Sequence, residues 1–110
     1  MSEIYAQIKS ATVDSPVIAS ADVEQIRDVC RRHWSSIADD IQAGTRLWIA
    51  QDNCLMVIHP HIEGIPDRAT WTDGNDCISG SWRDSVLHGD GDITINASGQ
   101  KRHPAQKIEF

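Results

Sequence analysis

The order of apolar and polar residues along the chain predicts one long helix. Apolar side chains spaced three and four apart run from Val23 to Ile41, which is the pattern of a helix with one buried face. This stripe consists of Val23, Ile26, Cys30, Trp34, Ile37 and Ile41. We expect a helix over about residues 20–41 that packs on a sheet and ends before Gly44, because glycine favours helix termination.

Strand patterns lie on both sides of this helix. Residues 4–8 alternate between apolar and polar side chains, which predicts a short first strand. Residues 46–50 and 54–58 are rich in β-formers and are separated by a polar link of hairpin length. The second of these runs is apolar at every position, so we expect a central strand that is covered on both faces. Residues 59–68 contain two prolines and a glycine and predict a loop.

The C-terminal half is marked by glycines and tryptophans at hairpin-like spacing. The pattern in residues 78–99 is formed by Gly80, Trp82, Asp84, His88, Gly89, Gly91 and Gly99. It resembles the MORN repeat, a short hairpin unit, and residues 71–74 resemble the end of an earlier copy. The resemblance implies strands around Trp82 and around Ile93, joined by a turn in which glycine supplies positive φ at 89 and 91. A short strand over residues 107–110 is expected to close the sheet.

These elements predict a single α+β domain spanning residues 1–110. Its expected architecture is one long amphipathic helix packed on an antiparallel β-sheet, with Gly-rich hairpins in the C-terminal half. The 110 residues fit the usual size of one domain. The chain is 40% hydrophobic and 24% charged, a balance typical of soluble globular proteins.

Charge is distributed unevenly around a formal net value of −6. Between Glu63 and Asp92 the acids outnumber the bases, while residues 101–107 carry a short basic tail. This balance argues against nucleic-acid binding, which needs clustered Lys and Arg, and favours a protein partner with a basic surface. The candidate partner-binding residues are Trp71, Asp73, Asp76, Trp82, Asp84, Asp90 and Asp92.

A metal site is the alternative use of the polar residues. His59, His61 and Glu63 alternate along the chain, and His103 follows later, so the four could supply ligands of the 2-His-1-carboxylate kind. Read this way, the chain is similar to cupins and would be a small metal-dependent enzyme. Pro60 interrupts the strand that such an arrangement needs, and a loop with surface histidines is favoured instead.

Other chemistry is weakly indicated. Ser79 and Ser81 flank Gly80, but strand patterns follow them where a nucleophile elbow requires a helix. The three cysteines are far apart and form no Cys-x-x-Cys pair, which is typical of reduced thiols. With neither a secretory leader in residues 1–11 nor an apolar run of membrane-spanning length, the sequence predicts a cytoplasmic protein without a membrane anchor.

The sequence therefore favours a non-catalytic protein-binding module over an enzyme. We expect an inhibitor, an immunity-type protein or an adaptor that uses no cofactor and docks on a basic surface of a larger protein. Self-association into a homo-oligomer stays open at this point.

Overall fold

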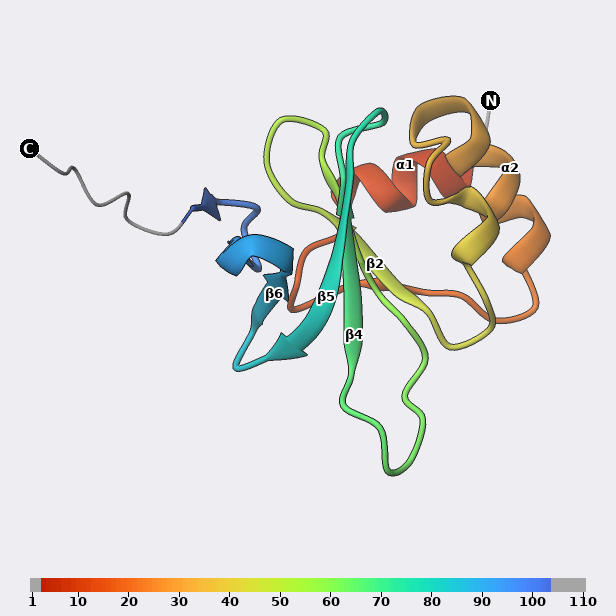
Figure 1. Ribbon diagram of the computed structural model, residues 1–110. Coiled ribbons are helices and arrows are strands. Elements are labelled where there is room, and N and C mark those ends of the chain that lie inside the picture. The colour runs from red at the N-terminus through yellow and green to blue at the C-terminus, as the bar shows by residue number, and fades with distance from the viewer. Residues whose placement is uncertain (1–2, 104–110) are drawn as a thin grey trace, which may run out of the picture.

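One antiparallel sheet with helices on one of its faces forms the fold (Figure 1). A computed structural model describes residues 3–103. Each strand pairs with the next along the chain, so the order in the sheet follows the order in the sequence. The strands are β1 (Val17–Ile18), β2 (Arg46–Ile49), β3 (Leu55–Ile58), β4 (Arg68–Thr72), β5 (Cys77–Arg83), β6 (Val86–Gly89), β7 (Thr94–Asn96) and β8 (Lys101–Arg102). The expected antiparallel α+β architecture is confirmed at this level.

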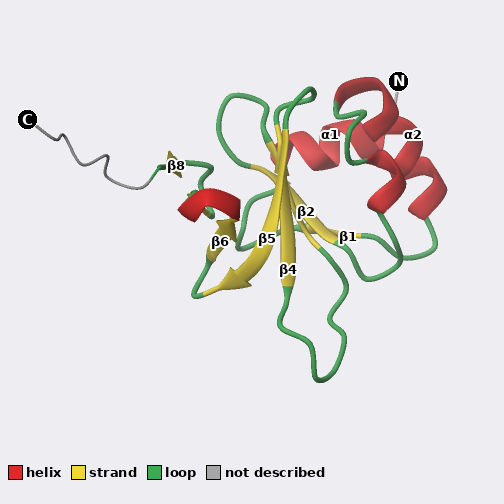
Figure 2. Cartoon of the chain, in the orientation of Figure 1, coloured by secondary structure: helices red, strands yellow, loops and turns green. Residues whose placement is uncertain are grey.

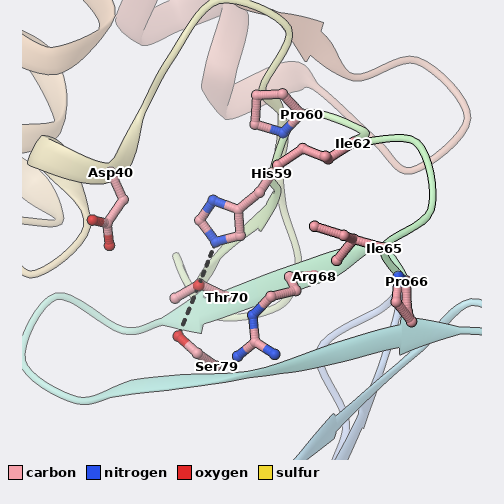
Figure 3. A pocket seen from close by; sticks show the side chains of 9 residues that line it. All are labelled: Asp40, His59, Pro60, Ile62, Ile65, Pro66, Arg68, Thr70 and Ser79. Carbon is pink, nitrogen blue, oxygen red and sulfur yellow. Dashed lines mark hydrogen bonds between the residues drawn. The ribbon is translucent and has the colours of Figure 1, made fainter.

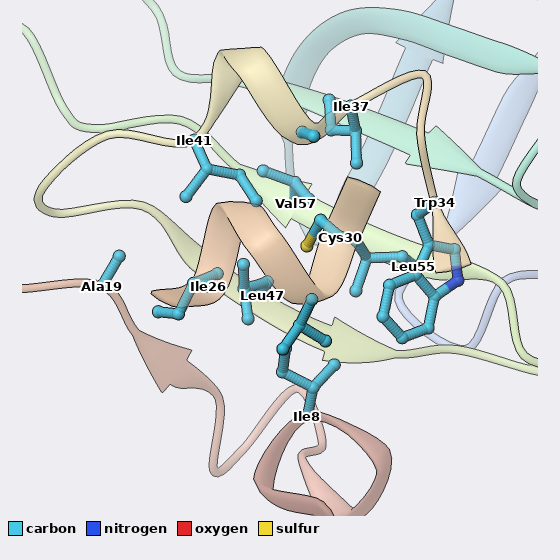
Figure 4. Packing of buried hydrophobic residues seen from close by; sticks show 12 residues of the cluster. Ile8, Ala19, Ile26, Cys30, Trp34, Ile37, Ile41, Leu47, Leu55 and Val57 are labelled. Carbon is cyan, nitrogen blue, oxygen red and sulfur yellow. The ribbon is translucent and has the colours of Figure 1, made fainter. Parts of the chain in front are cut away.

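The helical layer consists of two short helices and a 3-10 turn (Figure 2). Helix α1 (Glu3–Ser10) and helix α2 (Val23–His33) are followed by η1 (Ala38–Asp40), and a second 3-10 turn, η2 (Asp90–Asp92), lies between β6 and β7. The helices bury their apolar side chains against alternate residues of β2 and β3 (Figure 4). This first core contains Ile8, Ala19, Ile26, Val29, Cys30, Trp34, Ile37, Ala38, Ile41, Leu47, Leu55 and Val57.

The expected long helix over residues 20–41 is wrong, because helix α2 ends at His33. Trp34 leaves the helical conformation at φ −143° and ψ 62°, and two serines follow it before η1. Trp34, Ile37 and Ile41 are nevertheless fully buried in the same core. The apolar stripe therefore continues beyond the end of the helix because all of its side chains pack into the same core. The spacing of the apolar residues did not reveal that the backbone leaves the helix at Trp34.

The strand expected over residues 4–8 is also wrong, since these residues lie in helix α1. Ile4 and Ile8 are four residues apart, a spacing that places both on one helix face as well as on one strand face. Ile8 is fully buried and Ile4 packs against the first core, whereas Ala6 is exposed. The helix is favoured by Glu3 in its first turn and Lys9 in its last, which complement the helix dipole.

A second core fills the other face of the sheet. Met56 and Ile58 point to this face because they alternate with Leu55 and Val57 along β3, and all four are buried. The prediction of a strand covered on both faces is therefore confirmed for residues 55–58, and Cys54 lies just before the strand. The remaining members of this second core are Ala11, Trp48, Cys54, Ala69, Trp71, Leu87 and Ile95.

Contacts across the second core show that the sheet is curved. The rings of Trp48 in β2 and Trp82 in β5 meet edge to face, with centroids 5.9 Å apart. The Trp48 Nε1–H also donates a hydrogen bond of 2.9 Å to the carbonyl oxygen of Ala97, just after β7. Because β2 and β7 are not neighbours in the sheet, the later strands must bend toward the earlier ones.

The hairpin turns differ from the expected glycine turn. Strands β5 and β6 are joined by Asp84 and Ser85, which adopt φ of 53° and 61°. Gly89 instead lies in β6 opposite Gly80, where a Cβ on Gly80 would collide with the His88 carbonyl group. The glycine at position 80 therefore allows a close approach of two strands, while an aspartate and a serine form the turn. Gly91 does have positive φ, 69°, but inside η2.

Two sequence predictions remain, the closing strand at the C-terminal end and the lack of a membrane-spanning segment. The closing strand expected over residues 107–110 lies outside the described residues. Within the described part of the chain, neither helix has the length and apolar character needed to cross a membrane.

Candidate functional site

A pocket of about 310 Å³ lies where the helical layer ends and the polar part of the sheet begins (Figure 3). Its walls come from η1, from the segment that follows β3, and from the facing residues of β4 and β5. The lining residues are Asp40, His59, Pro60, Ile62, Ile65, Pro66, Arg68, Thr70 and Ser79. The pocket therefore combines both signs of charge, an imidazole, two hydroxyls and an apolar wall.

Strand register places the polar residues of the pocket side by side. Thr70 in β4 is opposite Val57 in β3 and opposite Ser79 in β5, so their side chains share one face of the sheet. His59 continues the β3 alternation, because its N–H donates to the carbonyl oxygen of Arg68 at 3.0 Å. The helices cover this face over β2 and β3 but leave it polar at Thr70 and Ser79.

A chain of hydrogen bonds connects three side chains of the pocket. His59 Nε2 lies 2.8 Å from Thr70 Oγ1, which lies 2.8 Å from Ser79 Oγ. Thr70 has one hydroxyl proton, so in neutral His59 two proton arrangements satisfy the chain. Either Nε2–H donates to Thr70 and Thr70 donates to Ser79, or Ser79 donates to Thr70 and Thr70 donates to Nε2. The second ring nitrogen, Nδ1, is an acceptor in the first arrangement and a donor in the second.

The surroundings of His59 favour its neutral form. Burial lowers the pKa of the imidazole from its ordinary value of 6.5, since it disfavours the charged ring. The Asp40 carboxylate raises this pKa and the Arg68 guanidinium lowers it, with burial the largest effect and a net shift downward. His59 is therefore mainly uncharged near neutral pH and can act as a hydrogen-bonding group.

Two opposite charges of the pocket are not paired with each other. The side-chain ion pairs within residues 3–103 involve Arg27, Arg31 and His61, and neither Asp40 nor Arg68 takes part in one. Figure 3 shows the Asp40 carboxylate and the Arg68 guanidinium on different sides of the His59 ring. Both side chains are exposed, so each charge is open to solvent and to any molecule that enters the pocket.

The apolar wall comes from the loop between β3 and β4. Ile62 and Ile65 are 59% and 51% exposed, although large aliphatic side chains are usually buried. Together with Pro60 and Pro66 they line the pocket mouth. Covering this wall would remove apolar surface from water, which favours a ligand with an apolar part.

The arrangement suits binding better than nucleophilic catalysis. A base that activates a serine must accept the hydroxyl proton directly, at hydrogen-bond distance. Here the hydroxyl that contacts His59 belongs to Thr70, which is 1% exposed, while the exposed Ser79 hydroxyl contacts Thr70 and not the imidazole. Neither hydroxyl is therefore both accessible and paired directly with the imidazole.

The structure does not bring the four candidate metal ligands together. His61 Nδ1 lies 2.7 Å from Asp67 Oδ1 on the surface, while His59 faces Thr70. Glu63 and His103 are exposed and lie on the β3–β4 loop and after β8. Within residues 3–103, no cluster of three or more His, Cys, Asp or Glu side chains could hold a metal ion. Of these residues only His59 lines the pocket.

The acids expected to bind a partner are spread over the sheet. Asp73 and Asp76 lie in the turn before β5, whereas Asp84 lies in the turn after it. The seven residues of β5 span about 20 Å between these turns. Asp90 and Asp92 form a third group in η2. The structure therefore offers three small acidic groups where the sequence suggested one face.

The two tryptophans expected at that face contribute to the second core instead. Trp71 is 7% exposed, and the Lys101 ammonium lies 5.6 Å from the centre of its ring. Trp82 is half-buried against Trp48. Docking through Trp71 would require this ring to leave the core.

The Asp73 carboxylate forms hydrogen bonds within the β4–β5 turn. Its Oδ1 accepts the backbone N–H groups of Asp76 at 2.8 Å and Asn75 at 3.0 Å. These bonds, that of Asp76 first, lower the pKa of the Asp73 carboxyl. The carboxylate therefore holds the β4–β5 turn in addition to adding charge.

Sequence reasoning did not name Asp40, Arg68 or Thr70 as site residues, and it considered Ser79 only as a nucleophile beside Gly80. Arg68 and Thr70 alternate with the apolar Ala69 and Trp71, a pattern that places them on one polar strand face. That signal identifies the face but not the neighbours, since Asp40 and Ser79 come from elements expected elsewhere.

Comparison with known proteins leaves the assignment to the geometry: no protein-family model matches the chain, and no curated protein or solved structure matches it. The resemblance of residues 78–99 to the MORN repeat accordingly stays a prediction.

Proposed function

We propose that the protein is a small binding module whose binding site is the pocket beside His59. The observation that carries this proposal is the composition of the pocket wall, in which an exposed apolar loop faces a row of hydrogen-bonding side chains. Ligand sites of small molecules commonly combine apolar surface with a few polar groups in a cleft of at least about 300 Å³. A volume of about 310 Å³ accommodates about ten water-sized groups.

A larger hollow of about 560 Å³ beside Trp48 supports the proposal less well. It lies between Val13, the β5–β6 turn and the β7–β8 connection. Among its lining residues Asp84 is the one charged side chain, and no imidazole faces it. It offers a ligand few groups that would orient it.

The acidic surface for a basic protein partner stays a prediction of the sequence. Its support is that Asp73, Asp76, Asp84, Asp90 and Asp92 make no ion pair with another described side chain. Their separation over the sheet makes a single docking face weaker than the pocket as a binding site.

Saturation-transfer NMR with a set of organic molecules of up to about ten non-hydrogen atoms tests the proposal. We expect some of these molecules to bind the natural chain. Their binding should be lost when Ile62 and Ile65 are both changed to Asn, because these changes remove the apolar wall. The matched control is Ile18→Asn, which changes an isoleucine of 58% exposure on β1, away from the pocket. The proposal is overturned if no molecule binds, or if binding survives the Ile62 and Ile65 changes.

A further inference from the structure

We infer that the molecule bound in the pocket is a small zwitterion with an apolar side chain, its ammonium group at Asp40 and its carboxylate at Arg68. This inference rests on the proposed binding function of the pocket.

Two side chains of opposite charge, Asp40 and Arg68, line the pocket. Asp40 and Arg68 are both exposed and line the same cavity, so one occupant of that cavity can face both side chains. Within residues 3–103 neither side chain forms an ion pair or a side-chain hydrogen bond. A molecule with a single charge would satisfy one of them and bring its charge near the other of like sign. A molecule with both charges satisfies the two together.

The Arg68 and Asp40 side chains suit different charged groups of a ligand. The planar guanidinium of Arg68 matches a carboxylate, with which it can form two parallel hydrogen bonds. An ammonium group has three donors and no acceptor, so the Asp40 carboxylate suits it, and neutral His59 can accept a further bond at Nδ1. Asp40 and Arg68 line one pocket on different sides of His59, so the ammonium and the carboxylate of a zwitterion that enters between them can each face the side chain of opposite charge (Figure 3).

The pocket also offers an apolar surface for the rest of the ligand. Ile62 and Ile65 form a wall that neither charge would use. An aliphatic side chain of four carbons on an amino acid fits both this wall and a volume of about ten non-hydrogen atoms. L-leucine is therefore a suitable probe.

The experiment is isothermal titration of the full chain with three related compounds. L-leucine carries both charges, 4-methylpentanoate lacks the ammonium group, and 3-methylbutylamine lacks the carboxylate. We expect leucine to bind about tenfold more tightly than either analogue, since each lost charged hydrogen bond costs about that factor.

Variants assign each end of the ligand. Arg68→Gln should weaken leucine and 4-methylpentanoate about tenfold and leave 3-methylbutylamine unchanged, because only the first two carry a carboxylate. Asp40→Asn should weaken leucine and 3-methylbutylamine and spare 4-methylpentanoate. The matched controls are Asp39→Asn, beside Asp40 but outside the pocket, and Arg83→Gln in β5. Thermal melting confirms that each variant is folded.

The outcomes separate this inference from the proposed function. If the three compounds bind equally and the variants do not discriminate between them, the zwitterion is wrong while the pocket remains a binding site. If none of the three binds, the zwitterion is wrong as well, and the saturation-transfer screen then decides on the pocket itself.

Discussion

Replacing Thr70 by valine tests the hydrogen-bond chain on which the site is built. Valine has nearly the shape of threonine but no hydroxyl, so it removes the partner of both His59 Nε2 and Ser79 Oγ. Thr70 is 1% exposed, which means that water cannot take the place of the hydroxyl at Thr70 itself. The change therefore separates hydrogen bonding from packing at one buried position.

The expected loss of stability follows from the two partners. A hydrogen bond contributes about 0.5–1.5 kcal/mol net, and an unsatisfied buried partner costs more than one that water can reach. Ser79 is exposed, so water can replace most of the bond that its hydroxyl loses. His59 is half-buried, so water replaces only part of the bond that its Nε2 loses. We expect Thr70→Val to lower the free energy of unfolding by about 1 kcal/mol, or the melting temperature by about 4–8 °C for a domain of this size.

Urea denaturation measures this loss, and nitrogen chemical shifts of the His59 ring show its cause. Thr70→Ser is the control, since it removes a methyl group but keeps the hydroxyl. We expect the Nε2 shift of His59 to change in Thr70→Val and to stay near its original value in Thr70→Ser. The reasoning is refuted if Thr70→Val is as stable as the natural protein, or if both variants leave the Nε2 shift unchanged.

Three further predictions concern other parts of the molecule. The free energy of unfolding should fall as pH drops below about 6.5, because the lowered folded pKa of His59 lets the unfolded chain take up the proton first; urea denaturation should show a smaller loss in His59→Gln, and equal losses would contradict this. Iodoacetamide should modify exposed Cys77 in the native protein but Cys30, whose pKa burial raises to about 12, only after unfolding; peptide mass mapping that finds Cys30 modified first would contradict this. Trp34→Ala should destabilise the protein by about 3–5 kcal/mol, because the ring is fully buried and its Nε1–H donates to the Asn53 carbonyl oxygen at 2.8 Å; a loss under about 1 kcal/mol in thermal or urea unfolding would be too small for this account.

The parts of the fold that the sequence predicts well are those set by local patterns. The hairpin over residues 46–58 follows from two β-rich runs and a short polar link, and its turn uses Asp52 and Asn53 at positive φ. The uniformly apolar residues of β3 indicated burial on both faces, and the structure places a core on each side. Neither prediction depended on knowing a distant partner.

The errors arose where one spacing is compatible with two backbones. Ile4 and Ile8 fit a strand face and a helix face equally, and the helix forms because Ile8 packs against α2 and β2 through the first core. Trp34 and Ile37 continue the helical spacing although the helix has ended, because the core accepts them from the following turn. Tertiary contacts determine the backbone conformation in both cases, and the spacing of apolar residues carries no information about those contacts.

The site required information that the sequence does not carry locally. His59 was identified as a candidate, but its partner is a hydroxyl in the next strand and not a second histidine. Thr70 and Ser79 meet only through the β4–β5 register, and Asp40 reaches the pocket because the long helix is broken before η1. Predicting the pocket would therefore have required the pairing of β4 with β5 and the residue at which helix α2 ends, and the sequence pattern determined neither.

The most direct test of the binding site is a map of amide chemical-shift changes in the natural chain, recorded while the tightest binder of the saturation-transfer screen is added. The account predicts shifts concentrated at Asp40, at residues 59–70 and at Ser79, the segments that line the pocket. Shifts confined to residues 73–76 and 84–92, the turns that carry the separated acids, would contradict it.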